Sequence, residues 1–84
     1  METRVAVLAI IVREGAGVTA LNDLLHQYAS YIISRMGLPY RKRNVNIISV
    51  AMDAPSDVIS ALSGKIGRLP GITAKTVYAP EEAL

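Results

Sequence analysis

The sequence predicts an α+β domain with the element order βαββαβ, a ferredoxin-like sandwich in which two helices cover one face of a four-stranded antiparallel sheet. Two observations support this fold class. Four runs rich in β-branched and aliphatic residues are interspersed with two segments whose apolar residues recur every three or four positions. Glycine, proline or clustered polar residues separate these segments, as turns require. A chain of 84 residues is long enough for one domain, so we assign residues 1–84 to a single domain.

The first strand is predicted over Arg4–Val12, because this short aliphatic run is closed by a glycine-containing turn. A helix follows, in which apolar residues recur at three- and four-residue steps: Val18, Leu21, Leu25, Tyr28 and Ile32. Polar Thr19 and Asn22 suit its first turn. The stretch Tyr31-Ile32-Ile33 fits either the last turn of this helix or the start of a strand.

The second strand is predicted over Ile32–Tyr40 and is placed at the edge of the sheet. Pro39 has no backbone N–H to donate, so it is tolerated at an edge and not in a central strand. The residues Arg41–Asn44 then form a polar hairpin turn. The third strand is predicted over Val45–Met52 and is followed by Asp53-Ala54-Pro55.

Ser56 or Asp57 can cap a second helix. Its apolar residues again recur at three- and four-residue steps: Val58, Ile59, Leu62 and Ile66. The last strand is predicted over Ile72–Tyr78, after Pro70-Gly71 has ended the helix. A charged tail that begins at Pro80-Glu81-Glu82 is expected to fray.

Composition excludes several classes of function. The net charge of +2 is too small to imply a strong attraction to nucleic acid. The absence of cysteine excludes disulfides, and with a single histidine it also excludes an iron–sulfur cluster or a Cys/His zinc site. The longest apolar run, Val5–Val12, is too short to span a membrane. Charged residues flank this run and no cleavage site follows it, so we expect no signal peptide and a cytoplasmic location.

Both central strands are predicted to be apolar on both faces, whereas a sheet with one bare face in a monomer alternates apolar and polar residues. Leaving about four aliphatic side chains in water would cost on the order of several kcal/mol, comparable with the net stability of a small domain. We therefore expect a homo-oligomer, a dimer or a tetramer. Its predicted interface consists of Val5, Val7, Ala9, Ile11, Val45, Ile47, Ile48 and Val50.

No residue pattern predicts catalysis. His26 is the only histidine and lies mid-helix, and no Ser/His/Asp or paired-carboxylate spacing accompanies it. We interpret the chain as non-enzymatic, with no cofactor and no metal site. Arg41–Arg43 is interpreted as a solvated hairpin tip, and direct nucleic-acid binding is not expected.

The candidate ligand-binding segment is the loop between the first strand and the first helix, formed by Arg13, Glu14, Gly15, Ala16 and Gly17. Glycines between a strand and a helix N-terminus can leave backbone N–H groups free to meet an anion or a ligand carboxylate. The same glycines also suit a tight turn that binds nothing, and both interpretations stay open at this point.

The chain resembles known families over nearly its full length. Leu62-Ser63-Gly64-Lys65-Ile66-Gly67-Arg68-Leu69-Pro70-Gly71-Ile72 is similar to the helix-to-last-strand passage of ACT-type regulatory domains, and the architecture resembles the sensor domain of the nickel-responsive repressor. The chain most closely resembles the iron-only hydrogenase system regulator family. The stretches that carry this resemblance are Arg4-Val5-Ala6-Val7, Leu24-Leu25-His26-Gln27-Tyr28, Arg35-Met36-Gly37-Leu38-Pro39-Tyr40-Arg41, Ile47-Ile48-Ser49-Val50 and Asp57-Val58-Ile59-Ser60-Ala61-Leu62.

These resemblances imply a regulatory role around a hydrogenase system. The sensor domain of the nickel repressor binds metal through histidines and a cysteine, and the corresponding residues Arg35–Met52 contain neither, so nickel sensing is not implied. That repressor also has a separate DNA-binding domain, and DNA binding is not implied here. Our first hypothesis is a regulatory module that binds a small effector near Arg13–Gly17 at a subunit interface and passes the change to a partner protein. The alternative is an interaction module without a ligand, whose edge strand Ile32–Tyr40 and basic hairpin Arg41–Arg43 recruit a partner by strand addition.

Overall fold

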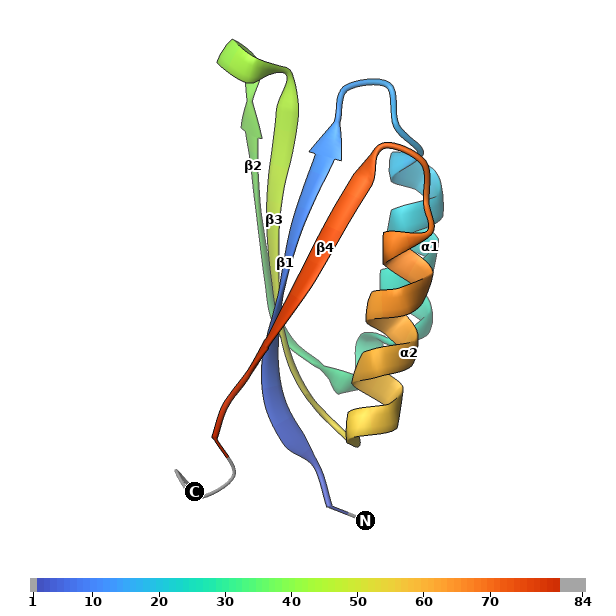
Figure 1. Ribbon diagram of the computed structural model, residues 1–84, viewed down its shortest axis with the longest axis vertical. Helices are drawn as coiled ribbons and strands as arrows, with labels where there is room; N and C mark the ends of the chain where they lie inside the picture. Colours follow the sequence, from blue (N-terminus) through green and yellow to red (C-terminus); the bar gives the residue numbers. More distant parts are fainter. Residues whose placement is uncertain (1, 81–84) are drawn as a thin grey trace.

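The computed structural model describes residues 2–80 and has the predicted α+β fold (Figure 1). Within this range the main elements are β1 (Arg4–Arg13), α1 (Val18–Gln27), β2 (Ile32–Tyr40), β3 (Val45–Ala54), α2 (Ser56–Gly67) and β4 (Ile72–Tyr78). Two single-turn 3₁₀ helices flank β2: η1 (Ala29–Tyr31) and η2 (Arg41–Arg43). Apart from Pro80, the predicted charged tail at Pro80-Glu81-Glu82 lies outside the described residues.

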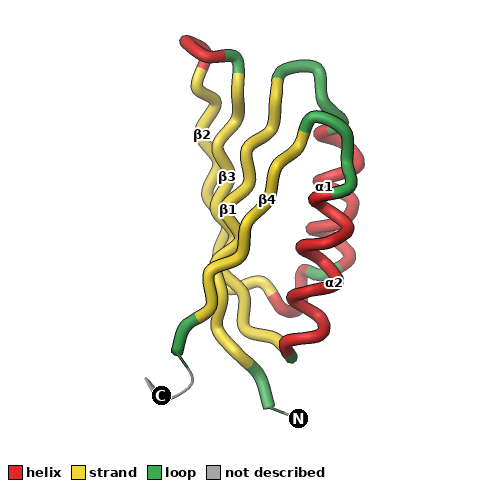
Figure 2. The backbone as a smooth tube through the Cα atoms, in the orientation of Figure 1, coloured by secondary structure: helices red, strands yellow, loops and turns green. Residues whose placement is uncertain are grey.

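The four described strands form one antiparallel sheet in the order β2-β3-β1-β4. Helices α1 and α2 lie together on one face of this sheet, and no described element covers the other face (Figures 1 and 2). Arg13 at the end of β1 pairs with Val45 at the start of β3. The β2–β3 hairpin therefore lies at the same end of the sheet as the loop between β1 and α1.

The core lies between the sheet and the two helices. Side chains alternate between the two faces of a strand, so every second residue of β1 and β3 points toward the helices. These residues are almost completely buried: Ala6, Leu8, Ile10, Val12, Ile48, Val50, Met52 and Ala54. The helices complete the core with Leu21, Leu25, Ile59, Leu62 and Ile66. Both central strands are longer than predicted, because Arg4 pairs with Ala54 and Arg13 with Val45 along their full length.

The helix ends settle two points that the sequence left open. Helix α1 ends at Gln27 and β2 begins at Ile32, so Ile32 belongs to the strand. Helix α2 begins after Pro55 and has no side-chain N-cap, in contrast to the predicted cap at Ser56 or Asp57. The Val58 N–H instead donates to Asp57 Oδ1 at 3.0 Å, one residue away. Neither these helices nor any other in residues 2–80 is long and apolar enough to cross a membrane.

Candidate functional site

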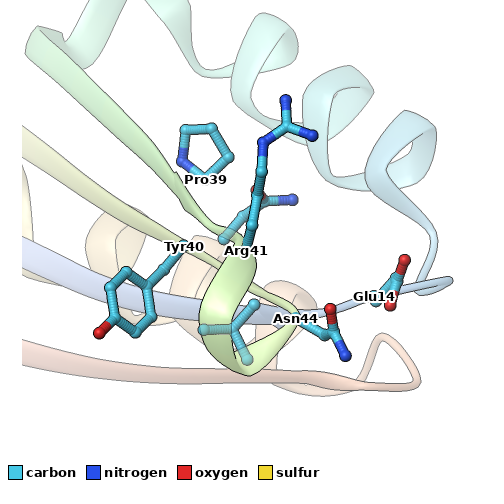
Figure 3. Close-up of a pocket in the computed structure, with 7 residues that line it drawn as sticks. Glu14, Pro39, Tyr40, Arg41 and Asn44 are labelled. Atoms are coloured by element: carbon cyan, nitrogen blue, oxygen red, sulfur yellow. The ribbon is translucent and has the colours of Figure 1, made fainter.

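A hollow of about 380 Å³ lies where the β2–β3 hairpin meets the β1–α1 loop (Figure 3). The loop contributes one lining residue and the hairpin contributes six: Glu14, Pro39, Tyr40, Arg41, Asn44, Val45 and Asn46. We call this the hairpin-end hollow. Figure 3 shows Asn44 beside Glu14, while the Tyr40 ring points to the other side of the hairpin from Arg41.

Backbone hydrogen bonds fix the loop and the hairpin to each other. The Glu14 N–H donates to the Asn44 carbonyl at 2.9 Å, and the Asn44 N–H donates to the Arg41 carbonyl at 3.2 Å. Asn44 has a φ of 55°, in the left-handed region that asparagine adopts more readily than most residues. This conformation turns the chain from η2 into β3. It also holds Glu14 and Arg41, which carry opposite charges, at the same hollow.

The predicted loop segment contributes only Glu14 to this hollow. Its backbone N–H groups are largely engaged within the fold. The Arg13 N–H donates to the Gly71 carbonyl at 2.9 Å, and the Ala16 N–H donates to the Arg13 carbonyl at 3.0 Å. Gly15 has a φ of +83°, which an L-residue rarely adopts. In this structure the glycine-containing segment is therefore a tight turn that presents Glu14.

The hairpin-end hollow offers one carboxylate from Glu14, one guanidinium from Arg41 and two carboxamides from Asn44 and Asn46. A guanidinium binds carboxylates and phosphates, whereas a carboxylate and amides accept hydrogen bonds from ammonium or amide donors. Within residues 2–80, no three His, Cys, Asp or Glu side chains come together in a group that could hold a metal ion. These four polar side chains can form hydrogen bonds and ion pairs with polar groups.

The face of the sheet opposite the helices is largely apolar. We call it the open sheet face. Its side chains, assigned from the strand register and exposure, are Val5, Val7, Ala9, Ile11 and Arg13 of β1, Ser34, Met36, Leu38 and Tyr40 of β2, Val45, Ile47, Ser49, Ala51 and Asp53 of β3, and Thr73, Lys75 and Val77 of β4. Its most exposed large apolar residues are Met36 at 72%, Val77 at 65% and Leu38 at 60%.

Of the eight residues predicted for an oligomer interface, six lie on the open sheet face: Val5, Val7, Ala9, Ile11, Val45 and Ile47. Ile48 and Val50 do not, because they point to the helices and are buried in the core. The reason is alternation, since Ile48 follows Ile47 directly in an extended strand and must point to the other face. The prediction also omitted β2 and β4, although edge strands contribute the most exposed apolar side chains.

A second hollow, of about 330 Å³, lies between α1 and β2. It is lined by Asn22, Leu25, His26, Ala29, Ile32 and Arg35. One Arg35 Nη donates to Asn22 Oδ1 at 2.6 Å, which ties the edge strand to the helix. The single histidine thus lies at the rim of a groove between two elements. No sequence pattern indicated this hollow, because Arg35 lies 13 residues from Asn22.

Comparison with known proteins places the chain in a family. The model of the TM1266-like family, described as "Iron-only hydrogenase system regulator, putative", matches residues 4–76. The chain belongs to this family. A solved structure, that of the uncharacterized protein TM1266 from Thermotoga maritima, is 36% identical in sequence with a TM-score of 0.90. The alignment covers 94% of this chain and 100% of the TM1266 chain. No curated protein matches.

Membership of the TM1266-like family confirms the resemblance that the sequence stretches indicated. The family match includes β1, both helices and most of β4, so it covers the hairpin-end hollow and all of the open sheet face except Val77. The description of the TM1266-like family is that of a regulator and names no substrate, ligand or reaction. Function must therefore be argued from the site.

Proposed function

We propose that this TM1266-like chain is a non-enzymatic regulator that binds a small polar effector in the hairpin-end hollow and works as a homo-oligomer assembled through the open sheet face. The observation that carries the proposal is that Glu14 and Arg41 line the same hollow, on segments held by the hydrogen bond between the Glu14 N–H and the Asn44 carbonyl. The family description as a regulator agrees with this role.

The charges of the hollow define the class of effector. Arg41 favours an anionic group such as a carboxylate or a phosphate, and Glu14 favours a group that donates hydrogen bonds. Asn44 and Asn46 can donate to or accept from the remaining polar atoms of a ligand. The hollow is open to solvent and about 380 Å³ in volume, which falls within the range of small-molecule sites.

Two residues of the hollow connect it to the proposed assembly surface. Tyr40 and Val45 pair with each other across β2 and β3, and both side chains belong to the open sheet face. An effector in the hollow therefore contacts residues at the margin of the surface that a second copy would cover. This adjacency supplies a route from ligand binding to assembly without a long chain of intervening contacts.

The open sheet face is poorly suited to single-stranded nucleic acid. Sheets of this topology that bind RNA use aromatic side chains on their central strands to stack bases. Here the centre of the face is formed by Ala9, Ile11, Ile47 and Ser49, and Tyr40 lies at its margin. Aliphatic residues in these positions favour contact with another apolar surface.

A thermal-shift screen of amino acids, nucleotides and metal ions against the full chain tests the effector. We expect at least one compound to raise the Tm, and Glu14→Gln and Arg41→Met to reduce that shift. Arg43→Met is the matched control, because it removes the same charge from η2 without lining the hollow. A flat response across the panel, or equal losses in all three variants, contradicts effector binding at this hollow.

Analytical ultracentrifugation of the full chain tests the assembly. We expect an oligomer at micromolar concentration, because the exposed aliphatic side chains gain about 25 cal/mol per Å² when they leave water. A purely monomeric protein over the whole micromolar range contradicts the oligomeric part of the proposal and leaves the effector site to be judged by the thermal shifts.

Strand addition at β2 is a second candidate function. All but one of the nine residues of β2 are exposed, and the strand forms one edge of the sheet. An unpaired edge can accept a strand from a partner protein. Charge reversal at Arg41, Lys42 and Arg43 distinguishes the candidates, because partner recruitment should fail under strand addition beside the basic hairpin. Recruitment that survives the reversal excludes this candidate.

A further inference from the structure

The open sheet face has a pattern of side-chain sizes and charges that favours one orientation of a second copy on it. Strand register divides the face into rows that run across the sheet. The central row has small residues at its centre and consists of Lys75, Ala9, Ser49 and Met36. The row on the hairpin side consists of Thr73, Ile11, Ile47 and Leu38, and the row on the other side of Val77, Val7, Ala51 and Ser34.

These two outer rows complement each other in size on β2 and β3. A two-fold axis along the central row would place the hairpin-side row of one copy against the opposite row of the other. Ile47 would then face the partner's Ala51, and Leu38 would face the partner's Ser34. On β1, Ile11 would face the partner's Val7, and on β4 Val77 would face the similarly sized Thr73 of the partner. Large side chains therefore meet small ones on β2 and β3, which favours close packing between the sheets at that side of the interface.

Charge selects the same orientation. Arg13 lies four residues beyond Ala9 on β1, and Asp53 lies four residues beyond Ser49 on β3, in opposite directions along the sheet. Both side chains are exposed on the open sheet face. At about 3.3 Å per residue each lies roughly 13 Å from the central row. The two-fold axis therefore brings Arg13 over the partner's Val5, beside the partner's Asp53, with which Val5 pairs in register.

If the strands of the two copies ran parallel instead, like charges would come together. Sheets that pack face to face in the aligned class keep their strands within about 30° of each other, so the strands of two copies run either antiparallel or parallel. A parallel two-fold arrangement would bring Arg13 toward the partner's Arg13 and Asp53 toward the partner's Asp53. The same repulsion would involve the basic hairpin tip, residues 41–43, which lies at the Arg13 end. The antiparallel arrangement pairs the opposite charges of Arg13 and Asp53, and the like charges that it places opposite each other are those of Lys75, on the edge strand β4.

The face is large enough for a stable dimer. Four strands about 4.8 Å apart and nine residues long give a projected area of roughly 570 Å², and side-chain relief increases the accessible area beyond this value. A standard interface buries about 800 Å² per partner, whereas most crystal contacts bury less than half of that. Lys75 lies in the central row on the edge strand β4, where its long side chain can extend past the sheet and keep its ammonium in water.

We propose that two copies of this chain pack their open sheet faces with β1 antiparallel to the partner's β1, and that Arg13 of each copy pairs with the partner's Asp53. This inference rests on the proposed function, because it takes the open sheet face as the assembly surface. It adds the orientation of the copies and the charge pair that fixes it. By symmetry, each dimer contains the pair twice.

Charge swapping in the full chain tests the orientation. Sedimentation equilibrium at low and moderate salt would measure the dimer Kd of the natural chain, of Arg13→Asp, of Asp53→Arg and of the double variant. We expect each single variant to raise the Kd by on the order of tenfold, because it replaces two attractive contacts by two repulsive ones. The double variant should return to within about threefold of the natural Kd. Arg68→Asp is the control, because it reverses a charge at the end of α2, on the helix side of the molecule.

The outcomes separate this inference from the proposed function. A natural chain that stays monomeric overturns both the assembly and its orientation. A dimer whose Kd does not respond to either single variant overturns the orientation and leaves the assembly through the open sheet face in place. A double variant that is as weak as the singles also overturns the charge pair. Far-UV circular dichroism and a thermal melt of each variant would show whether a loss of dimer reflects a loss of fold.

Discussion

Replacing Gly71 by alanine should destabilise the fold by about 2–4 kcal/mol. Gly71 has a φ of +75°, and the left-handed region costs an L-residue about 1–2 kcal/mol. A Cβ at this position would lie 2.9 Å from the Cβ of Ala16, in the loop after β1. Alanine has no rotatable side chain that could move aside, and overpacking of this kind costs about 1–3 kcal/mol. The lower entropy of the unfolded chain offsets about 0.4–1 kcal/mol.

Two other glycines separate the contributions. Gly15 has a φ of +83°, but a Cβ added there would have nothing within 4 Å, so Gly15→Ala reports the backbone cost alone, about 0.5–1.5 kcal/mol. Gly67, at the end of α2, has neither a positive φ nor a close neighbour. Gly67→Ala should therefore be neutral or stabilise the fold by up to about 1 kcal/mol through helix propensity.

Urea unfolding followed by circular dichroism would measure these differences as changes in the free energy of unfolding. All variants should be compared at one protein concentration, because self-association makes apparent stability depend on concentration. Gly71 thus brings the α2–β4 loop close to Ala16 of the β1–α1 loop. If Gly71→Ala loses no more stability than Gly15→Ala, the two loops are not packed as tightly as the structure indicates.

Other substitutions separate the two faces of the sheet and the link between the helices. Leu8→Ala should cost about 3–4 kcal/mol in urea unfolding, because Leu8 is fully buried between the sheet and the helices. Val7→Ala, on the open sheet face, should cost much less under monomeric conditions and should instead raise the dimer Kd; equal costs at the two positions would contradict the assignment of the faces. Tyr28→Phe removes the hydroxyl that accepts a hydrogen bond from Lys65 Nζ at 2.9 Å, and we expect a loss below about 1 kcal/mol because the pair is exposed. A larger loss in urea unfolding would show that this bond contributes to helix packing.

The order of the elements and the bounds of the two edge strands were predictable because local signals agree. Pro39 marks an edge strand, and Ile32–Tyr40 and Ile72–Tyr78 have the predicted limits. Local signals do not reveal which face of a central strand meets the helices. Ile10 and Ile11 are equally apolar, and only three-dimensional packing makes Ile10 buried and Ile11 exposed. Because side chains alternate along a strand, Ile47 and Ile48 must point to opposite faces of the sheet, so the two could not belong to one interface.

The candidate site was only partly predictable, because it joins segments that are distant in the sequence. The loop after β1 was identified through its glycines, and Glu14 within it does line the hollow. The other lining residues come from the β2–β3 hairpin, whose position depends on the order of strands in the sheet. In a βαββαβ sheet the third strand lies beside the first, so the hairpin tip necessarily lies near the end of the first strand. The strand order, and not a sequence motif, therefore places Arg41 and Glu14 at the same hollow.

The proposed effector site and the proposed dimer share Tyr40 and Val45, which form a row of the open sheet face with Arg13. In the antiparallel dimer this row faces the partner's Val5 and Asp53, so a ligand that changes the packing of Tyr40 changes a contact that exists only between copies. Coupling of this kind is reciprocal: the factor by which dimerisation alters effector affinity is also the factor by which the effector alters the dimer Kd. The loop and the hairpin are held together by backbone hydrogen bonds. The coupling free energy between effector binding and dimerisation would therefore arise from side chains at the end of the interface. Because the dimer has two such ends, two bound effectors would act on one association equilibrium.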